Sequence, residues 1–412
     1  MARIGFGAFL APHHPIGEHP MLQFRRDLDF AEHLDKLGYD EFWCGEHHSS
    51  GWEMIASPEM FLAAAAERTK RIKLGTGVVS LPYHHPFNVA QRMVQLDHMS
   101  GGRAIFGSGP GALPSDAYAL GIDPMVQRDR QDEAIGIIKR LMAGERVTAQ
   151  SEWFTLRDAA LQILPLQEEM PFVVASQISP SGMTLAGKHG IGVISIGSLS
   201  TEGLTALPTQ WAFAEDAAKK NGKTVNRKEW RVVLSWHIAE TREKAREEAG
   251  KGLMRWHNEY IVGTLQRPGA KPFKSIDDAL EKTSDSPGSA ATIGTPDDLI
   301  KTLKGVIEMS GGLGLVVGFA HDWANIENTF RSWEMVARYV IPEINGYVNG
   351  LRRSQKHVIE NRESFERAGQ AVMAKIMEND KAAAALAVTR TNRFAVSASN
   401  APDLEKAKAK KG

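Results

Sequence analysis

Five titratable residues lie where two apolar runs of this chain end, in the groups Glu46-His47-His48 and His84-His85. The runs, residues 39–45 and 72–80, have the composition of buried strands. Imidazole and carboxylate groups can exchange protons near neutral pH, and such groups gather at the carboxyl ends of parallel strands in an α/β barrel. If the two strands are parallel, we expect these side chains to share one active-site mouth.

A metal site is the first alternative for these residues, since zinc and non-haem iron take histidine and carboxylate ligands. Adjacent residues of a strand point to opposite faces, so His47 and His48 are not expected to bind one ion together. The chain also lacks a His-x-x-x-His pattern. We therefore predict no metal, and we expect backbone groups to satisfy the rings of His48 and His84.

Glycines mark the ends of two predicted strands. Gly75 and Gly77 flank Thr76, and glycine inside a strand indicates a bulge or the close approach of a ligand. The glycine-rich segment 107–111 can bring backbone against a flat ring. Its spacing differs from Gly-x-Gly-x-x-Gly and no Walker A lysine follows, so we expect neither an NAD fingerprint nor a P-loop.

Serines occupy the turn between the fifth predicted strand and its helix. Ser176, Ser179 and Ser181 precede the predicted helix 182–189. Hydroxyl groups and free N–H groups at a helix N-terminus can bind a phosphate. The same serines can act only as helix caps, and both interpretations stay open at this point.

Strand and helix patterns alternate along the chain, which favours a parallel sheet. The eight predicted strands cover residues 3–10, 39–45, 72–80, 103–107, 172–176, 192–196, 230–239 and 313–319. The eight predicted helices cover residues 21–37, 58–69, 87–99, 127–142, 182–189, 206–221, 242–261 and 325–344. Eight such pairs favour an α/β protein with a (β/α)8 TIM barrel over residues 1–345 more than a doubly wound sheet.

Three segments fall outside this repeat. The pattern of residues 147–164 predicts a hairpin that interrupts the alternation of strands and helices. Residues 262–295 are rich in proline and serine, and are either a mobile lid or a surface insertion without a role. Residues 346–412 form a C-terminal extension, with helical periodicity over 351–377 and a lysine-rich end, 406–411, that we expect to be disordered.

The composition argues against several classes of protein. Lys+Arg and Asp+Glu number 49 each, so the formal charge of +0 does not predict binding to nucleic acid or to an anionic membrane. Cys44 is the only cysteine, which excludes an intrachain disulfide. We find no signal peptide and no apolar run long enough to cross a bilayer, so we expect a cytoplasmic protein.

Four blocks of this chain together resemble the bacterial luciferase-like flavin monooxygenases: residues 46–48, 74–86, 96–103 and 106–107. Within that family, residues 38–48 and 81–87 look most like the limonene-oxidising members. The resemblance implies a TIM barrel that binds reduced FMN, with FAD as a second possibility. It also implies a separate NAD(P)H:flavin reductase as partner and a homodimer or a higher homo-oligomer.

The resemblance also assigns site residues. His47 matches the catalytic histidine of the family, and the Gly77–Val78 peptide matches a non-prolyl cis bond beneath the isoalloxazine ring. Gly109 replaces a cysteine near the flavin reaction centre, and Asp116 matches an acidic residue near the flavin pyrimidine. Ser176 lies in the family's phosphate loop, where Ser179 and Ser181 are its expected companions.

The implied reaction starts from reduced FMN and O₂, proceeds through a flavin C4a-hydroperoxide, and gives an epoxide from an alkene or an ester from a ketone. We expect His47 to act as acid or base there, because an imidazole with an unperturbed pKa of about 6.5 suits either role. The candidates for an apolar substrate pocket are Trp43, Tyr83, His85 and Phe319, although the aromatic residues among them also suit the barrel core. The alternatives are an F420-dependent oxidoreductase and a flavin-binding partner subunit without activity.

Overall fold

Eight parallel strands close into a barrel in the computed structural model, which describes residues 3–11, 13–286, 289 and 291–391. The strands are β1 (Gly5–Leu10), β2 (Glu41–Cys44), β3 (Lys73–Thr76), β5 (Ala104–Gly109), β8 (Phe172–Ser176), β9 (Gly192–Ser195), β10 (Trp230–Ile238) and β12 (Leu315–Phe319). The ring closes because β1 pairs with both β2 and β12, while β10 pairs with both β9 and β12. The predicted TIM barrel is confirmed, and each of its eight strands coincides with a predicted one.

The third predicted strand is interrupted. β3 ends at Thr76, and β4 (Val79–Ser80) then pairs with Ser108 and Gly109 at the end of β5. The Gly77–Val78 peptide between them is cis, as the resemblance implies. The chain therefore leaves the barrel wall at Gly77 and returns to it two residues later.

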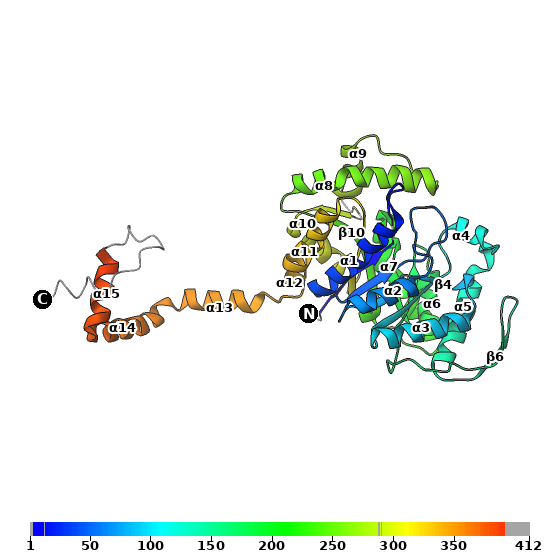
Figure 1. Cartoon of the computed structure of the whole chain (residues 1–412), viewed down its shortest axis with the longest axis horizontal. Helices are drawn as coiled ribbons and strands as arrows, with labels where there is room; N and C mark the ends of the chain where they lie inside the picture. Colours follow the sequence, from blue (N-terminus) through cyan, green and yellow to red (C-terminus); the bar gives the residue numbers. More distant parts are fainter. Residues whose placement is uncertain (1–2, 12, 287–288, 290, 392–412) are drawn as a thin grey trace. The chain divides into compact units, whose positions relative to one another are not determined.

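Amphipathic helices surround the strands (Figure 1). They are α1 (Pro20–Leu37), α2 (Pro58–Arg68), α3 (Pro86–Ser100), α5 (Gln127–Met142), α6 (Ser181–His189), α7 (Thr201–Lys220), α8 (Arg242–Arg255), α10 (Pro296–Met309) and α11 (Ile326–Met335), which a π-helical turn (Val336–Val340) and α12 (Ile341–Ile344) extend. α1 shows how the sequence sets their ends. The ring of His19 accepts a hydrogen bond from the N–H of Met21, Pro20 occupies the first turn, and Gly38 ends the helix in the left-handed region.

The barrel has an outer core beneath the helices and an inner core within the ring of strands. Inner side chains come from every second strand position and include Phe9, Trp43, Ile105, Val173, Ile194, Val233, Val317 and Phe319. Trp43 is completely buried there, and its indole N–H donates to Glu41 Oε2 at 2.9 Å. Glu41 is also paired with Arg231 of β10 at 2.8 Å. The prediction that Trp43 lines a substrate pocket is therefore wrong, because its ring fills the barrel interior and its polar atom is already bonded.

The segment predicted as a lid or an insertion is largely structured. It comprises a π-helix (Trp256–Thr264) that continues α8, the short helix α9 (Ile276–Leu280), another π-helical turn (Glu281–Asp285) and the strand β11 (Ala291–Gly294). α8 and α9 lie together at the top of Figure 1. β11 extends the sheet outside the ring by pairing with residues 235–238 of β10. Neither β11 nor α10 was predicted, whereas the predicted hairpin is confirmed as β6 (Val147–Gln150) and β7 (Thr155–Ala159).

The chain separates into two compact units, residues 1–345 and 346–412. The second unit contains α13 (Asn349–Glu360), α14 (Arg362–Glu378) and α15 (Asp380–Thr391). The predicted disordered end, 406–411, lies outside the described residues. Among the residues that the structure describes, no helix combines the length and the apolar character needed to cross a membrane.

Candidate active site

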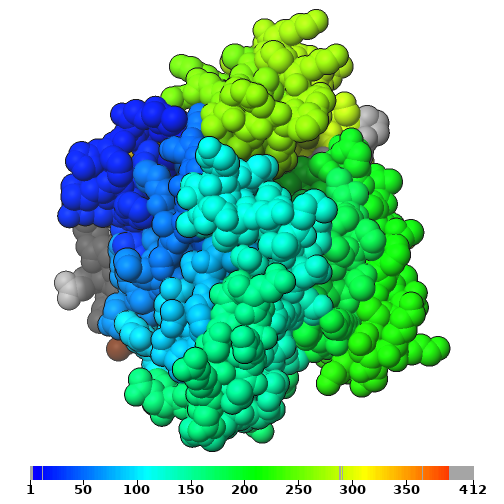
Figure 2. All heavy atoms as spheres, turned by 90° about the vertical axis from the view of Figure 1, so that its right-hand side faces the viewer, coloured from blue at the N-terminus to red at the C-terminus, as the bar shows by residue number. Residues whose placement is uncertain are grey.

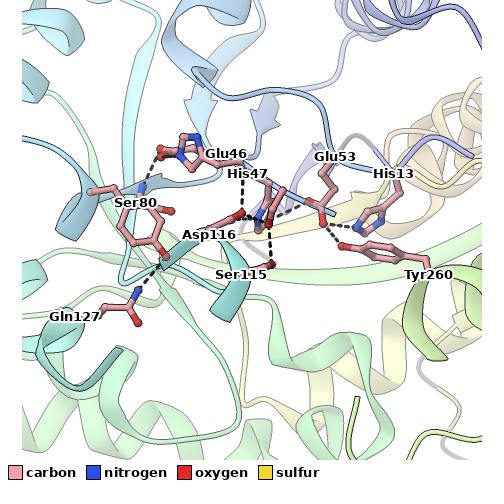
Figure 3. A network of polar contacts seen from close by, with 12 residues as sticks. His13, Glu46, His47, Glu53, Ser80, Ser115, Asp116, Gln127 and Tyr260 are labelled. Atoms are coloured by element: carbon pink, nitrogen blue, oxygen red, sulfur yellow. Dashed lines mark hydrogen bonds and ion pairs between the residues drawn. The ribbon is translucent and has the colours of Figure 1, made fainter. Parts of the chain in front are cut away.

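The loop after β2 places His47 between two carboxylates (Figure 3). Its Nδ1 lies 2.9 Å from Asp116 Oδ2, and its Nε2 lies 3.0 Å from Glu53 Oε2. The N–H of His47 donates to the carbonyl of Ile55 at 3.0 Å, which holds the backbone of the loop. Both ring nitrogens are thus engaged, and the imidazole is oriented from two sides.

The charge of His47 follows from this geometry. Burial alone would lower its pKa, but Glu53 and Asp116 outweigh burial and raise the pKa from 6.5 to about 10. The expectation of an unperturbed imidazole is therefore wrong. At neutral pH His47 is an imidazolium, which can donate a proton or hydrogen bonds but cannot act as a base.

Asp116 lies on α4 (Pro114–Ala119) and fixes the loop that carries His47. Its Oδ1 accepts a hydrogen bond from the N–H of His48 at 3.1 Å and another from the hydroxyl of Ser49. Burial would raise the pKa of Asp116, but His47 and Ser49 lower it, so the group stays ionised. The proposed place of Asp116 beside a flavin pyrimidine stays a prediction.

Glu53 is the site residue that the sequence did not indicate. Its side chain is only 3% exposed, and His13 Nε2 lies 3.0 Å from its Oε1. The hydroxyl of Tyr260, in the π-helix after α8, also donates to Oε1. His13 and His47 hold the pKa of Glu53 well below its usual range although burial opposes this shift. No spacing pattern links these residues, because three distant segments contribute them.

Glu46 forms a second buried centre beside the first. His48 Nε2 and His84 Nε2 each lie 2.8 Å from its Oε1, while its Oε2 accepts the N–H of Ser80 at 2.9 Å. Burial would raise the pKa of Glu46, but its histidine partners lower it to about 2. The expectation that backbone groups satisfy His48 and His84 is wrong, since a carboxylate does so.

The same three side chains, Glu46, His48 and His84, are the one group in the described part of the chain whose ligand atoms lie close enough together to hold a metal ion. Both imidazole Nε2 atoms are already hydrogen-bonded to the carboxylate. This geometry satisfies the polar atoms without an ion. His47 and His48 lie in the loop after β2, and their rings contact different carboxylates.

Of the remaining pocket candidates, Tyr83 and Phe319 lie at the mouth. The hydroxyl of Tyr83 accepts a hydrogen bond from Gln127 at 2.9 Å, and burial raises the pKa of this hydroxyl to about 12. The ring centre of Phe319 lies 5.3 Å from that of His13.

His85 lies at the start of α3, and its place in a substrate pocket stays a prediction. Its Nδ1 accepts the N–H of Phe87 at 3.3 Å and caps α3, while its ring packs edge-on against Phe154.

The cis peptide at the end of β3 lies beside the start of the loop that carries His47. The N–H of Gly77 donates to the carbonyl of Cys44 at 2.6 Å, so the 77–78 peptide leaves the barrel next to the start of the histidine loop. A Cβ added to Gly107 would lie 2.0 Å from the carbonyl oxygen of Thr76, and one added to Gly109 would lie 2.4 Å from Val78 Cγ2. Glycine is therefore required at positions 107 and 109 for β5 to pack against residues 76–78.

The start of α6 provides donors for an anion. The hydroxyls of Ser179 and Ser181 are exposed and 2.8 Å apart, and no described side chain caps the helix N-terminus. Ser176 does not join them, since it is completely buried below Gly182 and donates to the carbonyl of Gln177 at 3.3 Å. Two exposed hydroxyls at an uncapped helix N-terminus fit the phosphate of a flavin mononucleotide.

Figure 2 shows the molecular surface hollowed between the yellow-green segment after α8, the cyan segment around α4 and the green segment near the start of α7. These segments follow or flank the carboxyl ends of barrel strands, where TIM barrels carry their active sites. The hollow and the His47 network thus belong to the same end of the barrel.

Comparisons with known proteins identify the relatives of this chain. The family model described as luciferase-like monooxygenase matches residues 4–312. The chain is 47% identical to 4-hydroxyprotoasukamycin monooxygenase of Streptomyces nodosus subsp. asukaensis, over 87% of this chain and 97% of that protein. It is 42% identical to limonene 1,2-monooxygenase of Rhodococcus erythropolis, over 95% of this chain and 98% of that protein.

Among solved structures, the FMN complex of the oxygenating constituent of 3,6-diketocamphane monooxygenase from Pseudomonas putida shares the fold. Its TM-score is 0.69 at 24% identity, over 82% of this chain and 98% of that one. The family match and the two relatives confirm the predicted resemblance. This chain is an enzyme and belongs to the luciferase-like monooxygenase family.

Proposed function

We propose that this enzyme oxygenates a small, largely apolar substrate with O₂ and reduced FMN, and that a separate NAD(P)H:flavin reductase supplies the FMN. The names of its relatives support an oxygenase reaction. The observation that carries the proposal is the position of His47, which is held between Glu53 and Asp116 in a loop whose start is hydrogen-bonded to Gly77. Once one of these carboxylates is released, the charged imidazole stabilises negative charge that develops on an oxygen atom next to it.

The flavin, when bound, supplies the activation of O₂. In the proposed arrangement Gly77, Val78 and Gly109 support its ring system, and Ser179 and Ser181 with the start of α6 hold its phosphate. His47 donates a hydrogen bond or a proton to the reacting oxygen, which requires that it release Asp116 or Glu53 first, since both ring nitrogens are engaged. Tyr83 and Phe319 limit the access of water to the mouth.

The test combines binding and turnover. The purified chain is titrated with oxidised and reduced FMN, with FAD and with F420 while quenching of its tryptophan fluorescence is followed, and we expect tight binding of reduced FMN. The chain loaded with chemically reduced FMN is then exposed to O₂ and to a panel of terpene alkenes and cyclic ketones. We expect a product that contains one oxygen atom from O₂.

Two results would contradict the proposal. Hydride transfer to F420 without consumption of O₂ would identify an F420-dependent oxidoreductase. Binding of FMN without any product from the chain alone would favour a partner subunit without activity. The ratio of epoxide to ester across the panel then distinguishes alkene oxygenation from Baeyer–Villiger oxidation.

A further inference from the structure

Two histidine rings from different segments of the chain converge on one carboxylate oxygen. His48 lies in the loop after β2, and His84 follows a 3₁₀ turn (Leu81–Tyr83) that begins after β4. The Nε2 atoms of both rings lie 2.8 Å from Glu46 Oε1, and the three ligand atoms are within 4.8 Å of one another. We call the side chains of Glu46, His48 and His84 the Glu46 centre.

The objection that the sequence raises against a metal at His47 and His48 does not apply to this centre. The rings of those two neighbours contact different carboxylates, so they are not required to face one ion. His48 is grouped with His84 instead, which no spacing pattern indicated. Two imidazole nitrogens and one carboxylate oxygen are a ligand set that zinc and non-haem iron use in proteins.

The distances within the Glu46 centre are close to those of a metal site. With metal–ligand bonds of about 2.1 Å, neighbouring ligand atoms are about 3.0–3.4 Å apart in octahedral or tetrahedral coordination. The two N···O distances of 2.8 Å therefore need to increase by only about 0.2–0.6 Å. An ion in this position replaces the two hydrogen bonds, and each ring then carries its proton on Nδ1.

Backbone hydrogen bonds fix the three ligands in place. The N–H of Ser80 donates to Glu46 Oε2 at 2.9 Å, which orients the carboxylate and leaves Oε1 for an ion. The N–H of His48 donates to Asp116 Oδ1 at 3.1 Å, and the N–H of His84 closes the 3₁₀ turn, also at 3.1 Å. A site that is held in this way loses little conformational freedom when it binds a ligand.

The centre can be reached from solvent. The side chain of Glu46 is only 1% exposed, whereas those of His48 and His84 are 20% and 21% exposed. An ion can therefore approach along the rings, and water can complete its coordination. His47 is not a ligand of this centre, because both of its ring nitrogens are engaged by other carboxylates.

We propose that the Glu46 centre binds one divalent transition-metal ion through two imidazole nitrogens and one carboxylate oxygen. The ion joins the histidine loop (residues 46–48) to the segment after β4, and so holds the loop that carries His47. Mg²⁺ and Ca²⁺ do not fit this ligand set, since they prefer oxygen ligands alone. The inference concerns an additional site and does not depend on the proposed oxygenase function.

Zinc binding to the full chain tests the proposal. The purified chain is treated with EDTA and dialysed, and Zn²⁺ is then titrated in competition with a chelating dye of micromolar affinity. The dye sets a threshold, because a chance contact at the surface does not compete with it. We expect one bound Zn²⁺ per chain, a rise in Tm on binding, and no displacement of the ion by Mg²⁺.

Variants locate the ion. His84→Asn removes one ligand, and Glu46→Gln removes the charge of another. Each should weaken zinc binding by about a hundredfold, since the loss of an outer-shell partner alone typically costs about 10–100-fold. His189→Asn is the matched control, because His189 Nε2 lies 2.7 Å from Asp132 Oδ1 but this pair belongs to no group of three ligands among the described residues. It should keep the affinity of the natural chain.

Thermal unfolding without zinc shows whether each variant is folded. Anomalous diffraction at the zinc edge, from crystals of the natural chain soaked with Zn²⁺, places the ion directly even if a variant does not fold. A peak bonded to Glu46, His48 and His84 supports the proposal. It would be overturned by a failure to compete with the dye, by an affinity that both folded variants retain, or by a peak at other residues only.

Discussion

His47 owes its charge to Glu53 and Asp116, and this gives a pH dependence with a definite sign. Its pKa in the folded protein, about 10, lies above the ordinary value of 6.5. The stability that the charged ring contributes is therefore fully present below pH 6.5 and is lost as the pH rises through 10. Thermal unfolding measured across this range should show a decline that is absent from His47→Gln, and a histidine titration by NMR near pH 6.5 would contradict the assignment.

Removal of either carboxylate should lower the pKa of His47. We expect a fall of about 1–3 units in Glu53→Gln and in Asp116→Asn, because each deletes one negative charge in contact with the ring. Histidine NMR of the two variants measures the shift directly. Glu59→Gln is a suitable control, since Glu59 is buried on α2 but pairs with Ser57 and Arg92 instead. A similar shift in this control would mean that the network does not act through direct contact.

Among the elements, β5 depends most clearly on a single glycine. A Cβ at position 107 would lie 2.0 Å from the carbonyl oxygen of Thr76, and neither backbone can yield easily. Gly107→Ala should destabilise the protein by about 1–3 kcal/mol, because the added methyl group pushes the backbone of residues 76–78 away from β5. The same displacement should weaken FMN binding. Gly305 lies on α10, and a Cβ added there would meet no other atom. Gly305→Ala should therefore raise the free energy of unfolding by about 0.5–1 kcal/mol. Denaturant unfolding and FMN titration of both variants check this, and unchanged FMN affinity in Gly107→Ala would argue against the backbone seat.

The segment after α8 is attached to the barrel mouth through Tyr260. Its ring lies 5.3 Å from that of Trp52, and its hydroxyl donates to Glu53. Tyr260→Phe keeps the packing of the ring and removes the hydrogen bond. This should lower the free energy of unfolding by about 1–3 kcal/mol, because a buried carboxylate loses a donor. Limited proteolysis within residues 265–285 should then become faster, whereas Tyr339→Phe, at an exposed position, should leave the rate unchanged. Equal cleavage rates in Tyr260→Phe and the natural chain would show that this bond does not hold the segment.

At the scale of the whole molecule, residue 345 is where the first compact unit ends. The side chain of Asn345 bonds both backbone groups of Ile4, at 2.8 and 3.0 Å. A chain cut after Asn345 should keep its Tm within about 3 °C, because these contacts stay intact. A cut before Asn345 should lower the Tm further, since the backbone of Ile4 loses two partners. Calorimetry of both truncations checks this, and unfolding of the longer one would contradict the division.

The second unit gives a place to test the homodimer or higher homo-oligomer that the resemblance implies. Its described helices expose the apolar side chains Leu351, Val358, Ile359, Val372 and Met377. Light scattering of the full chain and of the chain cut after Asn345 shows whether these side chains contribute to self-association.

Local patterns in the sequence predicted the barrel because each strand is a short apolar run and each helix an amphipathic one. The fifth strand and the helix 127–142 have the predicted bounds. β11 was missed, since it has four residues and follows a stretch rich in serine and proline. The resemblance placed His47 and the cis peptide, and the sequence blocks that carry it lie close together along the chain.

The sequence by itself thus determined the order of the elements, the histidine loop and the glycine-lined strand ends, because these depend on neighbouring residues. Tertiary structure alone decided the direction of Trp43, since all four residues of β2 are buried and no polar alternation marks the inner face. It also decided the charge of His47. A pKa depends on distances between charges, and Glu53 reaches its partners His13 and Tyr260 from segments up to 207 residues apart.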